Sequence, residues 1–131
     1  MKTVMIVDDS MILRKKLTKV FEELDYKVVA TAKTGIEAVN MYEQFIPDIV
    51  TMDITMPDMT GIEAVKIIIE KYPNANIIMS SSHADLRTIK EALLFGAKGY
   101  TVKPVTKNKL EEEINKIFND ETNDDDELLD D

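Results

Sequence analysis

Five short apolar segments alternate with five longer segments of helical periodicity, and this alternation limits the possible folds more than any other feature. The apolar segments are rich in Val and Ile without strict alternation, as in strands buried on both faces. They are residues 4–7, 28–30, 49–52, 77–79 and 100–102. Between them apolar residues recur every three or four positions, which indicates amphipathic helices. The short connections predict an α/β fold, a doubly wound five-stranded parallel sheet with helices on both faces.

Two of the expected helices share one start signal, the residues TGIEAV at 34–39 and again at 60–65. In each copy a threonine precedes a glutamate by three positions, the spacing of a capping box that satisfies unpaired N–H groups of the first turn. Because the match extends no further, we interpret it as two similar helix starts and not as a duplicated domain.

The negative charge of the chain is concentrated at its C-terminus. The 131 residues include 25 acidic and 16 basic ones, a net charge of −9. Residues 120–131 (DETNDDDELLDD) hold eight of the acidic residues and no basic one, so the remainder is nearly neutral. We therefore expect one domain over residues 1–119 and an acidic, disordered tail over residues 120–131. Neither part has the clustered Lys and Arg of a nucleic-acid-binding surface.

Several other classes of protein are disfavoured by what the sequence lacks. The absence of cysteine excludes a disulfide framework and a thiolate metal site. No apolar run approaches the roughly 18 residues of a membrane span, and the start MKTVMIVDDS does not resemble a secretory signal. Neither G-x-x-x-x-G-K nor G-x-G-x-x-G occurs, so a nucleotide-binding fold has no support. We expect a cytoplasmic monomer without membrane insertion.

Polar residues directly follow four of the five apolar segments. Asp8 and Asp9 follow the first segment, and Asp53 follows the third. Three serines that include Ser81 follow the fourth, and Lys103 follows the fifth. In a doubly wound sheet, ligands bind at the carboxyl ends of the strands, near the point where the strand order reverses. We therefore expect three carboxylates, hydroxyl groups and one ammonium to converge on one edge of the sheet.

Such a group of side chains suits a metal ion and a phosphoryl group. Three crowded carboxylates repel one another unless they share a cation, and a hard dication with oxygen ligands relieves that repulsion. Mg²⁺ suits this set because it keeps several waters and takes few carboxylates. With a metal, a lysine and a hydroxyl to bind the phosphoryl oxygens, one carboxylate can act as the nucleophile and form an acyl phosphate.

These residues, together with the segment MPDMTG at 56–61, resemble the receiver domains of two-component response regulators. The similarity is greatest to the single-domain, CheY-like chemotaxis receivers, and it covers roughly residues 1–118. It implies the flavodoxin-like strand order 2-1-3-4-5, which periodicity alone does not fix. It also implies a cis peptide bond between Lys103 and Pro104, which proline alone makes plausible.

The resemblance implies a role for each residue at the predicted edge. Asp53 corresponds to the phosphoacceptor. Asp8 and Asp9 correspond to the metal pair, which would hold Mg²⁺ with Asp53 and with the backbone carbonyl of Thr55. Lys103 corresponds to the charge partner of the phosphoryl group.

Four residues are implied to control signalling and its duration. Ser81 corresponds to the hydroxyl that binds the phosphoryl group, and Tyr100 to the aromatic switch residue that turns inward with it. Thr55 and His83 occupy the two variable positions that the resemblance links to the rate of dephosphorylation.

The implied function is that of a response regulator without turnover of external substrates. A CheA-like sensor histidine kinase would donate the phosphoryl group to Asp53. The changed surface would then bind a downstream protein, such as a flagellar or archaellar motor component or its adaptor. A phosphatase is a further candidate partner.

Three alternative functions stay open with less support. The chain is compatible with a phosphorelay shuttle, or with the receiver half of a larger response regulator, although acidic residues and no basic linker follow the last helix. A phosphatase of the haloacid dehalogenase type also uses a strand-end aspartate. It needs a second aspartate two positions later as general acid, and that position here is Thr55.

Overall fold

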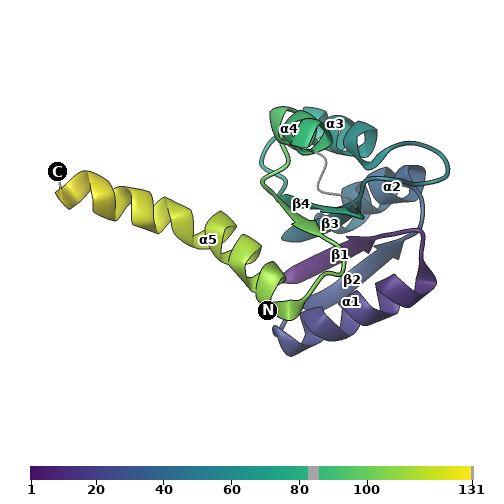
Figure 1. Cartoon of the computed structure of the whole chain (residues 1–131), viewed down its shortest axis with the longest axis horizontal. Helices are drawn as coiled ribbons and strands as arrows, with labels where there is room; N and C mark the ends of the chain where they lie inside the picture. The colour runs from purple at the N-terminus through teal and green to yellow at the C-terminus, as the bar shows by residue number, and fades with distance from the viewer. Residues whose placement is uncertain (83–85, 131) are drawn as a thin grey trace.

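The computed structural model describes the backbone of residues 1–82 and 86–130, and the side chains of residues 1–82 and 86–119. Five strands and five helices alternate along this part of the chain, as the sequence pattern predicts (Figure 1). The strands are β1 (Thr3–Val7), β2 (Lys27–Ala32), β3 (Ile49–Asp53), β4 (Ile77–Ser81) and β5 (Gly99–Val102). The helices are α1 (Met11–Glu23), α2 (Gly35–Phe45), α3 (Gly61–Lys71), α4 (Leu86–Leu94) and α5 (Lys107–Asp130).

The five strands form one parallel sheet in the order β2-β1-β3-β4-β5. This confirms the fold class and the strand order that the family resemblance implies. The chain moves outward from β1 to β2 on one side and from β3 through β5 on the other. The strand order therefore reverses between β1 and β3, which places a ligand-binding crevice at the carboxyl ends of these two strands.

Each face of the sheet has its own hydrophobic core. Helices α2, α3 and α4 cover one face, where Tyr42 and Ile68 pack against the strands. Helices α1 and α5 cover the other face, where Phe21 and Leu110 are fully buried. Alternate residues of β1 enter opposite cores, with Met5 and Val7 in the first core and Val4 and Ile6 in the second. This explains why the strands are continuous apolar runs instead of alternating patterns.

Both repeated TGIEAV segments begin helices, as predicted. Thr34 is the N-cap of α2, and its hydroxyl accepts a hydrogen bond from the N–H of Glu37 at 3.1 Å. Thr60 caps α3 in the same way through the N–H of Glu63 at 3.2 Å. In both copies the threonine therefore satisfies an N–H group of the first helical turn.

Helix α5 continues beyond the domain boundary expected at residue 119. Its backbone is helical from Lys107 to Asp130, and its C-terminal half extends away from the sheet (Figure 1). Most of the segment expected to form a tail is therefore continuous with the last helix of the core, and its disorder stays a prediction. Among the described residues, no helix is long and apolar enough to span a membrane.

Candidate functional site

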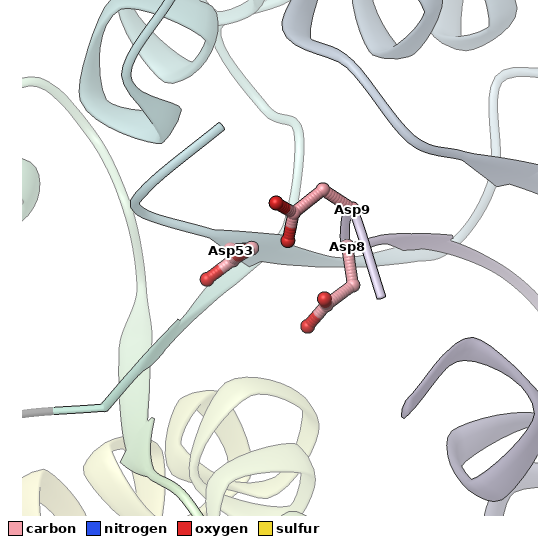
Figure 2. Close-up of side chains that lie close together, drawn as sticks. All are labelled: Asp8, Asp9 and Asp53. Atoms are coloured by element: carbon pink, nitrogen blue, oxygen red, sulfur yellow. The ribbon is translucent and has the colours of Figure 1, made fainter. Parts of the chain in front are cut away.

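Three carboxylates meet at the carboxyl edge of the sheet, as the order of residues along the chain predicts. Asp8 follows β1 and Asp53 is the last residue of β3, and only 1% and 4% of their surfaces are exposed. Asp9 lies beside them and is exposed to solvent. One oxygen atom from each of the three carboxylates lies within 4.8 Å of the other two (Figure 2).

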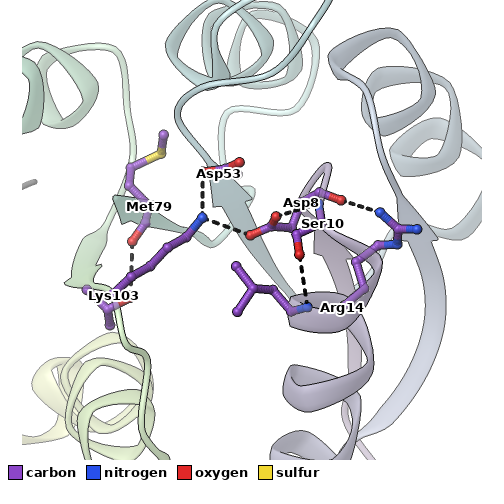
Figure 3. A network of polar contacts seen from close by, with 8 residues as sticks. Asp8, Ser10, Arg14, Asp53, Met79 and Lys103 are labelled. Carbon is purple, nitrogen blue, oxygen red and sulfur yellow. Dashed lines mark hydrogen bonds and ion pairs between the residues drawn. The ribbon is translucent and has the colours of Figure 1, made fainter. Parts of the chain in front are cut away.

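The Lys103 ammonium lies between the two buried carboxylates. Its Nζ atom is 3.0 Å from Asp8 Oδ2 and 3.1 Å from Asp53 Oδ1 (Figure 3). The backbone of Lys103 is also fixed, because its N–H donates a hydrogen bond to the carbonyl oxygen of Ser81 at 2.7 Å. The bond between Lys103 and Pro104 is cis, as the family resemblance implies. The structure thus joins residues at the carboxyl ends of four strands, β1, β3, β4 and β5.

Burial and neighbouring charges shift the ionisation of this group. The pKa of Asp53 is raised from its usual 3.8 to about 6; burial is the largest cause, the Asp8 carboxylate adds to it, and the bond to Lys103 acts in the opposite direction. Burial by itself lowers the pKa of Lys103, but the bonds to Asp8 and Asp53 and their negative charges raise it overall. Lys103 therefore stays protonated at neutral pH. A single ammonium does not balance three carboxylates, so the edge retains an excess of negative charge.

The arrangement of oxygen atoms fits a divalent cation such as Mg²⁺. Asp8 Oδ1 accepts a hydrogen bond from the Ser10 N–H at 2.9 Å. Asp8 Oδ2 is buried, and the Lys103 ammonium at 3.0 Å is its partner. Because one ammonium does not balance the three carboxylates, the group is expected to bind a further cation. Hard oxygen ligands from two buried carboxylates and one exposed carboxylate are the set that Mg²⁺ prefers.

Two residues outside the predicted set hold the β1 end of the site. The Arg14 guanidinium donates a hydrogen bond to the backbone carbonyl of Asp8 at 2.7 Å. Ser10 caps α1 through the N–H of Leu13, and so connects the Asp8 loop to the start of that helix (Figure 3). Arg14 carries no distinguishing signal in the sequence, because it is one basic residue on a helix with three lysines.

Gly61 holds the β3 end of the site by its lack of a side chain. A β-carbon at this position would overlap the carbonyl oxygen of Asp53 and lie 2.9 Å from its carbonyl carbon. The N–H of Gly61 donates to the carbonyl of Ile54 at 2.6 Å, which closes the loop after β3. Glycine in the segment MPDMTG is therefore required for close backbone approach at the candidate phosphoacceptor.

Three of the four residues predicted to transmit or time the signal lie on β4, on β5 and in the loop after β3. Ser81 ends β4, opposite Val102 of β5, and is partly exposed. Tyr100 lies on β5 with 41% of its surface exposed, and its N–H donates to Glu113 Oε1 at 3.0 Å. Thr55 is exposed in the loop after β3. His83 lies outside the described residues. The switch and rate-modulating roles stay predictions.

Comparisons with known proteins agree with this geometry. The sequence model of the response regulator receiver domain matches residues 4–115. The chain is 43% identical over 116 residues to the chemotaxis protein CheY of Thermotoga maritima, covering 88% of this chain and 97% of that protein. It is 40% identical to the chemotaxis protein CheY of Listeria monocytogenes, covering 88% and 98%. A solved CheX-CheY-BeF3-Mg complex from Borrelia burgdorferi is similar with a TM-score of 0.86 and 39% identity, covering 89% of each chain.

Proposed function

This chain belongs to the response regulator receiver domain family, and from that premise we propose that it is a single-domain response regulator phosphorylated on Asp53. One observation carries the proposal. A buried strand-end carboxylate, Asp53, lies 3.1 Å from the Lys103 ammonium and within 4.8 Å of the Asp8 and Asp9 carboxylates. Nucleophile, cation and metal ligands are thereby assembled where a phosphoryl group can bind.

Asp53 supplies the nucleophile for phosphoryl transfer, and Lys103 supplies a positive charge for the phosphoryl group. An Asp53 oxygen attacks the phosphorus of a phosphohistidine on the donor, so an O–P bond forms while the P–N bond to the histidine breaks. With a pKa of about 6, Asp53 is mainly ionised at neutral pH and available as a nucleophile. The Lys103 ammonium then has a phosphoryl oxygen as an alternative partner to the carboxylates.

We assign Mg²⁺ as the cofactor, held by the carboxylates of Asp8, Asp9 and Asp53 and by the backbone carbonyl of Thr55. When bound, Mg²⁺ neutralises negative charge on the carboxylates and on the phosphoryl oxygens. The gathering of three carboxylates around a single ammonium supports this assignment. We expect no turnover of external substrates, because hydrolysis of the acyl phosphate only regenerates Asp53, at a rate modulated by Thr55 and His83.

We further propose that phosphorylation acts as a switch in a chemotaxis pathway. The phosphoryl group would bind Ser81 and Lys103 and bias Tyr100 toward an inward position, which would change the surface near β5. The match to CheY proteins over nearly their whole length supports a CheA-like sensor histidine kinase as donor, in the cytoplasm. A motor component or its adaptor would be the target, and a phosphatase a further partner. A phosphorelay shuttle is the second candidate function.

The acceptor assignment is tested by incubation with acetyl phosphate and Mg²⁺, followed by intact-mass measurement at neutral pH. The wild type should gain one phosphoryl group and the Asp53→Asn variant none. Equal incorporation into both proteins would refute the assignment. Capture of partners by the phosphorylated protein, compared with Asp53→Asn, then distinguishes a motor component from a second histidine-containing phosphotransfer protein.

A further inference from the structure

The loop between β3 and α3, residues 54–60, carries the Thr55 carbonyl that the proposed function assigns to Mg²⁺. At the base of the loop, the Ile54 N–H donates to the carbonyl of Ser80 at 3.2 Å, and Gly61 closes the loop onto Ile54. In the middle of the loop, Met56 is buried in the core beneath α2, α3 and α4. Thr55 lies between these two attachments, so the position of its carbonyl depends on how the whole loop is held.

At the tip of the loop, Asp58 contacts a different element. Its Oδ1 and Oδ2 atoms accept hydrogen bonds from the N–H groups of Gly35 and Ile36, each at 2.9 Å. These are the first two N–H groups of α2, which have no partner within the helix. The two bonds hold the pKa of Asp58 below its usual value, so the carboxylate stays charged beside the positive end of the helix dipole.

The loop and the start of α2 are also in close van der Waals contact. A β-carbon at Gly35 would overlap Met59 Cγ and lie 2.7 Å from its sulfur atom. Helix α2 already has a local cap, because Thr34 accepts the N–H of Glu37. The two bonds to Asp58 therefore do more than begin the helix: they join residues that lie 22 and 23 positions apart in the sequence.

We propose that Asp58 is a positioning residue for the metal and phosphoryl site, because it fastens the tip of the β3–α3 loop to α2 and thereby holds the Thr55 carbonyl in place. This inference rests on the proposed function of Asp53 and its metal ligands. A loop held at both base and tip loses less conformational freedom when Mg²⁺ binds. Residues that orient metal ligands in this way affect affinity without touching the metal.

The test compares three variants in Mg²⁺ titrations by calorimetry, with urea unfolding as a measure of stability. Asp58→Ala should weaken Mg²⁺ binding about tenfold, the low end of the range for residues that orient metal ligands. Thr34→Ala removes the local cap of the same helix and should change the affinity by no more than about twofold, as expected away from the site. Asp58→Asn removes the charge but keeps one accepting oxygen, and its affinity should lie between that of Asp58→Ala and that of the wild type.

Each other result counts against the proposal. Wild-type affinity in Asp58→Ala would overturn it. A loss in Asp58→Asn as large as in Asp58→Ala would assign the effect to charge alone, and an equal loss in Thr34→Ala would assign it to the stability of α2. If the wild type binds Mg²⁺ and is phosphorylated on Asp53 while Asp58→Ala behaves like the wild type, only this inference fails. If the wild type does neither, the proposed function fails and takes this inference with it.

Discussion

The ionisation of Asp53 links the candidate site to the stability of the metal-free domain. Its pKa is raised from 3.8 to about 6, first by burial and then by the charge of Asp8. The folded state therefore binds this proton more tightly than the unfolded state. The corresponding stability is present at low pH and is lost as the pH rises from about 4 through about 6.

We predict that Asp53→Asn stabilises the metal-free protein above pH 7. A shift of this size is equivalent to at most about 3 kcal/mol, and the gain will be smaller because asparagine also gives up the ion pair with Lys103. Urea unfolding in the presence of a chelator, on both sides of pH 6, measures the difference. The gain should shrink as the pH falls and should diminish when Mg²⁺ saturates the wild type. A difference in unfolding free energy between Asp53→Asn and the wild type that does not change with pH would contradict the raised pKa of Asp53.

Replacement of Lys103 should lower the stability of the metal-free protein and raise its affinity for Mg²⁺. Replacement by methionine leaves the buried Asp8 and Asp53 carboxylates without their shared counter-charge. Because the Lys103 side chain is 17% exposed, the metal-free protein should lose about 3 kcal/mol or less, the low end of the range for a buried pair. The same change removes a cation that repels Mg²⁺, so metal affinity should rise. Unfolding experiments and calorimetric titration measure the two effects, and Lys103→Arg, which keeps the charge, is the control. A lower Mg²⁺ affinity in Lys103→Met would show that the ammonium assists metal binding.

At the scale of the elements, the junction between β3 and α3 depends on Gly61. The added methyl group in Gly61→Ala would press on the backbone of Asp53, which cannot rotate away as a side chain can. We predict a loss of about 2–4 kcal/mol in the free energy of unfolding, as for strain in a packed region, and slower phosphorylation by acetyl phosphate. Urea unfolding and intact-mass kinetics check both effects.

Gly99 at the start of β5 is a matched control for this prediction. A β-carbon there would lie 2.7 Å from Glu113 Oε1, which belongs to a side chain that can move. Gly99→Ala should therefore cost clearly less stability than Gly61→Ala and leave the rate of phosphorylation nearly unchanged. Equal losses in both variants would mean that general crowding, and not contact with the Asp53 backbone, explains the effect.

Local patterns predicted the elements well, because each depends on neighbours in the sequence. Strands buried on both faces appear as continuous apolar runs, and the caps at Thr34 and Thr60 require only a residue three positions later. Strand order depends on contacts between distant segments, and it came from the family resemblance and not from periodicity. The helical backbone of residues 120–130 was not expected from their sparse apolar residues.

The candidate site was predictable as a set of residues but not as a geometry. Strand ends meet at one edge in any parallel sheet, so the gathering of Asp8, Asp9, Asp53 and Lys103 followed from their order in the chain. The sequence did not distinguish buried Asp8 from exposed Asp9, because both follow the same strand. It also gave no sign of the bonds made by Asp58, since a contact across 22 or 23 residues depends on the path of the backbone.

At the scale of the whole molecule, the acidic sequence of residues 120–131 includes the C-terminal part of α5. The carboxylates of the candidate site lie at the carboxyl edge of the sheet. Helix α5 follows β5, and its C-terminal half extends away from the rest of the fold (Figure 1). The acidic segment starts 13 residues after the first residue of α5, a distance of about 20 Å along the helix, which is roughly twice the screening length of 8–10 Å at physiological salt. The acidic tail should therefore have little electrostatic effect on the site.

Truncation after Asn119 tests whether the acidic segment is independent of the domain. Phe118 is the last apolar residue that packs against the core in the described part of the chain. The removed segment carries eight acidic side chains, and its larger apolar side chains are only Leu128 and Leu129. We predict a change in unfolding free energy within about 0.5 kcal/mol, as is usual away from packed features. Phosphorylation by acetyl phosphate should be unchanged at physiological salt and slightly faster at low salt, because a source of repulsion for the anionic donor is gone.

A variant of the 131-residue chain with the acidic residues of the tail changed to Asn and Gln should behave like the truncation. A clear fall in the unfolding midpoint, or loss of partner binding at high salt, would instead indicate that the two leucines dock on the domain or on a partner.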